Sequence, residues 1–436
     1  MAQQLYFSRD SKMFLEFDGY VWEIPVLDGF SFSQATNSSE ITLAEMESAA
    51  GASRRGRRAF NDSLAPGEWS FSTYVRPFTS VGSGTASNPA DNSGKADSAA
   101  EVHAVEEVLW ALMAGADNYD GTTKDFDKGG SNVITPGSST SAITFTHSNV
   151  STLSTFNLYF VLGDANRTVM KLDGCVVGEA SIDFDIDGIA TIAWSGNSAN
   201  VVDFTGSTIE ASGASNPPAI TATTQDGSTI AVGDVFLDTN AGHKLKVVLT
   251  KPGSGNVTVT PYVNEKILDT NNFIRNRLTV LTVEPTSTDP DSDGSAELES
   301  EYLLTLTGGN VTISNNITFI VPEELGIVNV PIGHVTGTRN VSGSFTCYLT
   351  EDTGNTKASR DFFEDLRAIT NVVTNSFALV FKIGGATGTG LELSMPTSHV
   401  EIPTHSIEDV ISLETNFQAL PSSIDLANEL ALTYRP

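Results

Sequence analysis

Gly29-Phe30-Ser31-Phe32-Ser33, followed by Trp69-Ser70-Phe71-Ser72-Thr73-Tyr74-Val75, alternates polar and apolar residues. A similar pair returns later, as Asn310-Val311-Thr312-Ile313-Ser314 and Gly343-Ser344-Phe345-Thr346-Cys347-Tyr348-Leu349. Such alternation is typical of β-strands buried on one face. Each pair precedes an apolar-striped helix pattern, at 104–114 and 361–372, and then a further strand pattern, at 156–161 and 377–382. The repeated order of strand, strand, helix and strand predicts a duplicated, mainly β (α+β) building block.

The duplication suggests three parts. We expect a first unit over residues 1–203, a second unit over 271–436, and between them a linker or small β module over 204–270. In the first unit, Asp18-Gly19 predicts a hairpin turn, and 168–194 predicts a long strand pair. Residues 35–67 and 120–142 are rich in polar residues and glycine and are predicted to be loops.

Two face assignments follow from the spacing of apolar residues. The strand at 68–76 is expected to bury one face, made of Trp69, Phe71, Thr73 and Val75. The first helix is expected to bury one stripe and to end at Gly115, with Val105, Val108, Leu109 and Leu112 on that stripe.

Composition limits the possible partners. The chain of 436 residues has 53 Asp and Glu against 24 Lys and Arg, a formal net charge of −29. Nucleic-acid and anionic-membrane binding need clustered cations, so this balance disfavours both. There is no apolar leader and no apolar run of about 20 residues, so we expect synthesis and folding in the cytoplasm.

No motif assembles an enzyme. The sequence has no His-x-x-x-His pair, Gly-x-Ser-x-Gly elbow, phosphate-binding loop or dinucleotide fingerprint. The glycine-rich segment 384–390 joins two strands without a following helix or lysine, and is predicted to be a hairpin loop. Cys175 and Cys347 lie in apolar runs without metal-ligand spacing. We therefore predict no catalytic residues, no cofactor and no metal.

One acidic segment has two interpretations. Asp289, Asp291, Asp293 and Gly294 match the start of a calcium loop, but the twelfth position is Ser300 and no helices flank the segment. An acidic hairpin tip is the preferred interpretation, with calcium binding as the alternative.

A strand pattern carries a row of carboxylates. Glu179, Asp183, Asp185 and Asp187 share one face, while Ile182, Phe184 and Ile186 are predicted to face the core. In the second unit, Val400 and Ile402 repeat the apolar face and Glu401 lies between them. Like charges on one strand face repel, so this face needs solvent or a cationic partner.

Arg54, Arg55, Arg57 and Arg58 form the one dense basic cluster. Read alone, the cluster fits a nucleic-acid contact, a solvated loop or an arm that pairs with carboxylates of another subunit.

A set of short sequence segments is spread over nearly the whole chain outside 204–270, and those within 55–74 are the most specific. They are Ser38-Ser39-Glu40-Ile41-Thr42, Arg55-Gly56, Phe60-Asn61-Asp62-Ser63-Leu64, Glu68-Trp69-Ser70-Phe71-Ser72-Thr73-Tyr74, Trp194-Ser195-Gly196-Asn197, Asn276-Arg277-Leu278-Thr279, Thr312-Ile313-Ser314-Asn315-Asn316-Ile317-Thr318, Pro331-Ile332-Gly333, Ile402-Pro403-Thr404 and Ala419-Leu420-Pro421-Ser422. These segments resemble the major tail tube proteins of T-five-like siphophages.

The resemblance implies two fused tail tube units, each a β-sandwich flanked by one helix. It implies a structural virion protein that forms trimeric, pseudo-hexameric rings, which stack into the conduit for DNA ejection. The implied partners are other copies of the chain, the tail tape measure and tail-terminating proteins, and phage DNA that passes without specific binding. The carboxylates named above are then expected to line the water-filled channel, and the four arginines to connect rings.

Two departures from the family stand beside this resemblance. Residues 204–270 are longer than the family's connector, and an appended immunoglobulin-like decoration domain is expected to be absent after Tyr434-Arg435-Pro436. A secreted or surface β-sandwich adhesin is the alternative function; the missing leader and the two-unit pattern argue against it.

Overall fold

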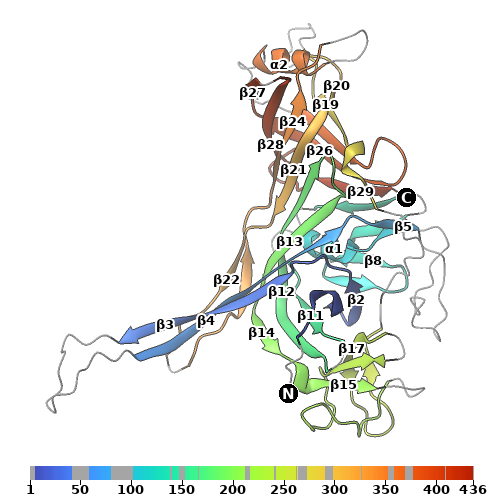
Figure 1. Ribbon diagram of the computed structural model, residues 1–436, viewed down its shortest axis with the longest axis vertical. Coiled ribbons are helices and arrows are strands. Elements are labelled where there is room, and N and C mark those ends of the chain that lie inside the picture. The colour runs from blue at the N-terminus through green and yellow to red at the C-terminus, as the bar shows by residue number, and fades with distance from the viewer. Residues whose placement is uncertain are drawn as a thin grey trace, which may run out of the picture.

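The computed structural model describes residues 5–41, 58–79, 102–137, 140–146, 153–164, 166–211, 217–239, 242–261, 263, 273–289, 298–325, 327–351, 358–368, 377–407 and 409–435. Strands dominate, which confirms the predicted mainly β fold (Figure 1). Up to residue 203 the elements are β1 Ser11–Phe17, β2 Tyr20–Ile24, β3 Ser31–Ile41, β4 Arg58–Tyr74, β5 Pro77–Thr79, β6 Val102–Ala104, α1 Glu107–Ala114, β7 Asn118–Asp120, β8 Asp125–Lys128, β9 Ser131–Pro136, β10 Ser141–Thr144, β11 Phe156–Leu162, β12 Thr168–Asp185, β13 Thr191–Ser198 and β14 Asn200–Asp203.

The later elements are β15 Thr208–Ala211, β16 Val235–Asp238, β17 Lys244–Thr250, β18 Thr258–Val259, β19 Val280–Pro285, β20 Tyr302–Leu304, β21 Leu306–Ser314, β22 Ile317–Ile320, β23 Gly333–Thr336, β24 Asn340–Tyr348, α2 Ser359–Ala368, β25 Phe377–Ile383, β26 Gly390–Val400, β27 Thr404–Ile407, β28 Ile411–Ala419 and β29 Ala431–Arg435. Short 3-10 turns lie at Ser8–Asp10, Thr205–Ser207 and Asn276–Leu278.

The strand pairings occur twice in the same order. In the first repeat, β1 to β14, β11 lies between β1 and β12, β14 pairs with β12, and β13 lies between β12 and β4. In the second repeat, β19 to β29, β25 lies between β19 and β26, β29 pairs with β26, and β28 lies between β26 and β24. β3 pairs with β4 as β21 pairs with β24. The duplicated order read from the sequence therefore corresponds to a duplicated topology, although the domain boundaries stay predictions.

Both repeats contribute to one eight-stranded antiparallel sheet in the order β3-β4-β13-β12-β21-β24-β28-β27. The long strand β12 enters this sheet with its second half only, and β26 reaches it only with Ser398–Val400, which pair with the end of β28. Their first halves belong to two flanking sheets, β2-β1-β11-β12-β14 and β20-β19-β25-β26-β29. The main hydrophobic core lies between the eight-stranded sheet and the flanking sheets.

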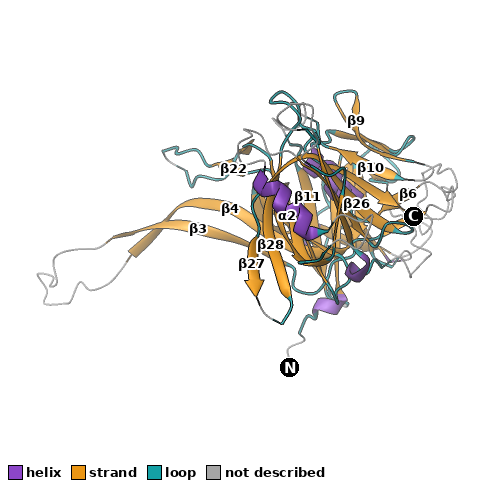
Figure 2. Ribbon diagram, turned by 90° about the horizontal axis from the view of Figure 1, so that it is seen from above, coloured by secondary structure: helices purple, strands orange, loops and turns teal. Residues whose placement is uncertain are grey.

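Two predicted loops contain strands. β3 and β4 stay paired from Ser31↔Ser70 to Ile41↔Arg58, so much of 35–67 forms a hairpin that projects far from the body (Figures 1 and 2). Its residues outside the body are exposed on both faces, so the apolar alternation that marks a strand is missing. Residues 120–142 contain β8 and β9 and the start of β10, which extend the second flanking sheet by the pairing of β10 with β29.

The first helix differs from its predicted stripe, whereas the described part of the second buries Phe362 and Leu366 and exposes Arg360 and Glu364. α1 begins at Glu107 and ends at Gly115, whose φ of 98° makes the expected glycine stop. All eight residues of α1 are buried, because β12 covers one side and β9 and β10 cover another. α2 spans Ser359–Ala368, and the end of the predicted helix after 368 lies outside the described residues.

Other local predictions are confirmed. Asp18 and Gly19, with φ of 48° and 76°, form the turn between β1 and β2. Trp69, Phe71, Thr73 and Val75 are all buried. Within 204–270, β15 to β18 form a four-stranded sheet, and β16 and β17 pack on the first flanking sheet through Val235, Leu237, Leu245 and Val247; the bounds of a separate module stay a prediction.

A buried polar cluster joins α1 to the last strand. Glu106 is fully buried, and its Oε1 accepts hydrogen bonds from the Tyr434 hydroxyl at 2.9 Å and the Arg76 backbone N–H at 3.4 Å. Trp110 Nε1 donates to the Tyr434 oxygen, and His103 Nδ1 lies 3.0 Å from Glu107 Oε2. Burial raises the pKa of Glu106 from 4.5 to about 7. The folded state therefore favours the protonated carboxyl.

This pKa shift predicts a pH-dependent effect of Glu106→Gln. The pKa of Glu106 is higher in the folded state than in the unfolded state, so the folded state binds the proton more tightly. The resulting stabilisation is complete below pH 4.5 and is lost as the pH rises to about 7. Because one pKa unit corresponds to about 1.4 kcal/mol, Glu106→Gln should raise the free energy of unfolding by about 1–3 kcal/mol at about pH 9 and by far less at about pH 5. Urea unfolding at both pH values measures this. The exposed Glu364→Gln is the control, and an equal effect of Glu106→Gln at both pH values would contradict the interpretation.

Candidate functional site: the acidic face of the eight-stranded sheet

One face of the eight-stranded sheet is polar from edge to edge. Residues directly opposite in the register share a face, so the pairings connect Ser31 through Ser70, Ser195, Glu179 and Ser314 into one row. Parallel rows continue the same surface into the second repeat. Its other members are Ser33, Glu68, Ser72, Ser181, Asp183, Asp185, Thr191, Asn310, Thr312, Ser342, Ser344, Thr346, Thr404, Ser406, Ser412, Glu414, Asn416 and Gln418.

The opposite face holds the sheet in place. Trp69, Phe71, Trp194, Ile182 and Phe345 are buried there, and Trp194 Nε1 donates to Thr73 Oγ1 at 3.0 Å. Glycine is required at two core-facing positions. A Cβ at Gly196 would collide with the Val176 carbonyl and the Trp69 ring, and one at Gly343 with the Asn310 carbonyl. These close contacts fix the polar face outward.

The predicted carboxylates divide at the end of β12. Glu179, Asp183 and Asp185 are exposed on the polar face, while Ile182 and Phe184 are buried as expected. β12 ends at Asp185, whose Oδ1 accepts the Gly188 N–H at 2.7 Å. Asp187 therefore lies in the turn after the strand. The prediction that Ile186 faces the core is wrong, because the alternation ends with the strand and this side chain is 41% exposed.

Glu401 lies in the second repeat where Glu179 lies in the first. The Glu401 backbone N–H donates to the Asn416 carbonyl at 2.9 Å, and Asn416 Nδ2 donates to Glu401 Oε2 at 2.9 Å. Asn416 pairs with Ser344 as Ser195, the partner of Glu179, pairs with Ser70. Val400 is buried as predicted, but Ile402 is 51% exposed, since it falls in the irregular link between β26 and β27.

The face has one sign of charge. Its carboxylates are Glu68, Glu179, Asp183, Asp185, Glu401 and Glu414. Within the described strand segments 31–41, 67–74, 176–185, 191–198, 306–314, 340–348, 404–407 and 411–419 there is no Lys or Arg. Unpaired charges cost several kcal/mol when buried dry, on the order of 3–5, whereas water and salt screen them. The arrangement suits a hydrated wall.

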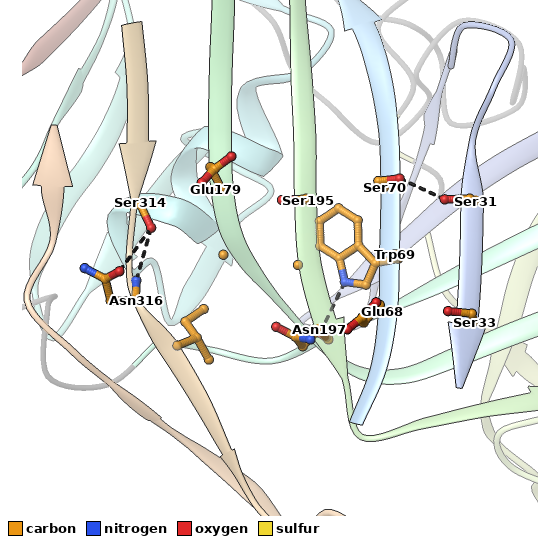
Figure 3. Close-up of a pocket in the computed structure, with 13 residues that line it drawn as sticks. Ser31, Ser33, Glu68, Trp69, Ser70, Glu179, Ser195, Asn197, Ser314 and Asn316 are labelled. Carbon is orange, nitrogen blue, oxygen red and sulfur yellow. Dashed lines mark hydrogen bonds between the residues drawn. The ribbon is translucent and has the colours of Figure 1, made fainter. Parts of the chain in front are cut away.

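Figure 3 shows a hollow of about 470 Å³ in this face. Ser31, Ser70, Ser195 and Glu179 border it across four strands, and Asn316 and Ser314 lie at its far side. Hydroxyl, amide and carboxylate groups dominate the lining, and no His or Cys lies among the lining residues. Among the described residues, no group of three His, Cys, Asp or Glu side chains is arranged to hold a metal ion.

The other predicted sites lie mostly outside the described residues. Arg54, Arg55 and Arg57 fall there, and Arg58 is the exposed first residue of β4. Asp289 is described, but Asp291, Asp293 and Gly294 are not. No described helix is long and apolar enough to cross a membrane.

Comparison with known proteins agrees with the resemblance read from the sequence. No family model matches the chain. The tail tube protein pb6 of Escherichia phage T5 is 28% identical over 412 residues, which is 93% of this chain and 69% of pb6. A match of this length includes both repeats and supports a structural tail tube role. The chain is thus similar, over nearly its whole length, to the tail tube proteins of T5-like phages, as the sequence segments indicated.

Proposed function

We propose that this chain is the structural subunit of a phage tail tube. Three copies form a ring through the edges of the eight-stranded sheet, rings stack, and the acidic face lines the channel through which DNA leaves the capsid. The observation that carries the proposal is the joint between the two repeats, since it shows how such sheet edges pair. The similarity to pb6 supports the structural role, in place of a catalytic one.

The internal joint is the pairing of β12 with β21. It runs antiparallel from Glu179↔Ser314 to Asp185↔Gly308, and Ser181 Oγ lies 3.2 Å from Thr312 Oγ1. In the topological repeat, β3 corresponds to β21, and the link from Glu401 through β27 corresponds to the second half of β12. The two strand edges that join inside the chain, those of β12 and β21, therefore have equivalents in the other repeat. These equivalents, β27 and β3, are the two outer edges of the eight-stranded sheet.

These outer edges have no strand partner among the described residues: β3 pairs with β4 alone and β27 with β28 alone. Unpaired edges expose backbone donors and acceptors, which favours association. If β3 of one chain pairs with β27 of its neighbour in the register that β21 and β12 use inside one chain, Ser33 lies opposite Thr404 and Ser31 lies opposite Ser406 of the neighbouring chain. All four side chains are exposed. Because the two edges differ, the contact is heterologous. It closes into a ring when each contact turns the chain by a third of a circle, and the three chains then supply six repeats.

The channel assignment rests on charge. In a closed ring the polar face of every chain would form one continuous wall that has carboxylates and, in the described strand segments named above, no Lys or Arg. Such a wall offers DNA no counterion release, so the polyanion can slide. We assign Glu179, Asp183, Asp185, Glu401 and, beyond the strand end, Asp187 to this wall.

The remaining assignments follow from the tail tube role. The tape measure protein would occupy the channel before DNA, and terminating proteins would close the stack. The chain would be made and assembled in the host cytoplasm and reside in the virion tail. The long hairpin of β3 and β4 projects far from the body (Figure 1), and we propose that it reaches another ring. Arg58, the first residue of β4, and Arg54, Arg55 and Arg57, which precede it in the sequence, are proposed to meet carboxylates there.

Cysteine pairs test the ring contact. Ser33→Cys with Thr404→Cys should crosslink neighbouring chains on oxidation, because opposite residues of antiparallel strands come within disulfide range. Denaturing electrophoresis should show a ladder that stops at three chains. Ser181→Cys with Thr312→Cys is the matched control, which should close within one chain and leave the mass unchanged. A ladder that continues past three chains would refute the trimer. Rings in electron micrographs of a sample that shows no crosslinks would refute the register.

Lysine substitution tests the channel wall. Rings of the unaltered protein should not bind a short DNA duplex at low salt. Rings with Glu68→Lys, Glu179→Lys and Asp183→Lys should bind it, with the salt dependence of counterion release. Fluorescence anisotropy measures both. Exposed carboxylates off the sheet give the charge-matched control, Glu351→Lys, Glu364→Lys and Asp425→Lys. Equal DNA binding by the two variants would mean that the acidic face does not line the channel.

Serine substitution tests the arginine arm. Exposed ion pairs contribute about 0–1 kcal/mol each, and desolvated bidentate pairs about 1.5–3. Replacing Arg54, Arg55, Arg57 and Arg58 with Ser should therefore leave folded rings that form shorter tubes. Tube length in electron micrographs at two salt concentrations is the readout. Tubes of unchanged length and salt resistance would speak against the ionic contact.

A further inference from the structure

A second arm of the chain exposes more apolar surface than its surroundings explain. It consists of residues 317–336, with β22 and β23 at its base, and runs beside the β3–β4 hairpin (Figures 1 and 2). Leu325 is fully exposed and Ile332 is 69% exposed. The other large apolar side chains exposed on this arm are Ile320, Ile327, Val328, Val330 and Val335. So dense an apolar patch on a chain of charge −29 marks an interaction surface.

The second arm is held firmly at its base. Asn315 is buried, and its Nδ2 donates to the carbonyls of Met113 at 3.1 Å and Val177 at 3.3 Å. On the returning side, Arg339 forms a buried ion pair with Glu429 and lies over the Phe145 ring. These contacts fix both ends of the arm on the body.

The outer part of the second arm is tied to the first. The Leu64 N–H donates to the Asn329 carbonyl at 2.8 Å, and the Asn329 N–H donates to the Asp62 carbonyl at 3.1 Å. The apolar residues beside Asn329 are therefore presented away from their own core. A preordered segment loses little conformational entropy on binding, which favours association.

The chain itself offers a receptor of matching chemistry. Leu5, Tyr6 and Phe7 are 72%, 54% and 53% exposed and border a hollow of about 310 Å³. The guanidinium of Arg9 lies 5.0 Å from the Phe7 ring centroid, and its side chain is 79% exposed. The hollow also contains Asp10, 3.7 Å from Arg9, and Asp164, 3.4 Å from Arg167, so each of its carboxylates already faces a cation.

Charge complements this fit. Residues 317–336 contain Glu323 and Glu324, both exposed, and no Lys or Arg. Lys12 lines the hollow next to that of Leu5–Phe7, together with Arg9 and Arg167. An apolar tip flanked by carboxylates thus has a counterpart in a hollow that Leu5, Tyr6 and Phe7 line in part. Arg9, Lys12 and Arg167 flank this hollow, although each also faces a carboxylate of its own chain.

We propose that the tip of the second arm inserts Leu325 and Ile327 into the Leu5–Phe7 hollow of a second copy of this chain, in the adjacent ring. Because the two surfaces differ, each chain can give one contact and receive one, and the contact propagates along a stack. The inference rests on the proposed self-assembly, but it concerns the contact between rings and not the sheet edges that close each ring.

Mixed crosslinking tests the pairing directly. A Leu325→Cys protein is mixed with a Phe7→Cys protein and oxidised, so that a heterodimeric band reports contact between different chains. The native Cys175 and Cys347 are buried and leave the background low. Ile424→Cys, 93% exposed, mixed with Phe7→Cys is the control and should give no band above background. Absence of the Leu325–Phe7 band in samples that contain stacked rings would overturn the proposal.

Charge substitution at the tip tests its contribution. Leu325→Asp with Ile327→Asp should raise the protein concentration needed for stacking at least about tenfold, while single rings and the melting temperature stay unchanged. Ile424→Asp should have no such effect. Sedimentation velocity separates single rings from stacks. Normal stacking of the double variant would overturn the proposal. If the unaltered protein formed no rings at all, the proposed function would be refuted instead.

Discussion

The pairing of β12 with β21 is the constraint on which the structure depends, because it turns two similar repeats into one sheet. Its register is fixed by chemistry on both faces. A slip of one residue would bury Asp183 and Glu179 in the core and expose Ile182. Burying unpaired carboxylates costs several kcal/mol each, about 3–5, so a register shifted by one residue is excluded. The charge row that suits a hydrated wall therefore also specifies the strand alignment.

The sequence reveals those features whose physical signal is local. Alternation identified the buried face of Trp69 and Phe71, and turn chemistry identified Asp18-Gly19 and the glycine stop after α1. The same alternation identified the exposed row of Glu179 and Asp183, and the duplicated order corresponds to the repeated pairing. Each of these depends on a few neighbouring residues, which a sequence displays directly.

Features that depend on residues far apart in the sequence have no local signal. The β3–β4 hairpin has no apolar face, since its strands leave the core, and so it reads as loop. α1 is buried on all sides by strands from other parts of the chain, which no helical stripe can show. Ile186 and Ile402 continue an alternating pattern beyond the point where the strand ends or becomes irregular. The apolar second arm has no sequence signal that marks it as exposed, since Ile and Val most often lie in a core, and only the fold shows them exposed.

The small sheet of β15 to β18 accompanies only one of the two repeats, where it covers Phe14, Val21 and Tyr159. A tube built from such chains would have two different symmetries at once. In the proposed ring of three chains, the inner wall would repeat approximately every 60°, since both repeats present a similar polar row, while the exterior would repeat only every 120°. Covalent fusion of the two repeats makes this difference in symmetry possible, because the outer surface of one repeat can change its shape while the channel wall stays the same.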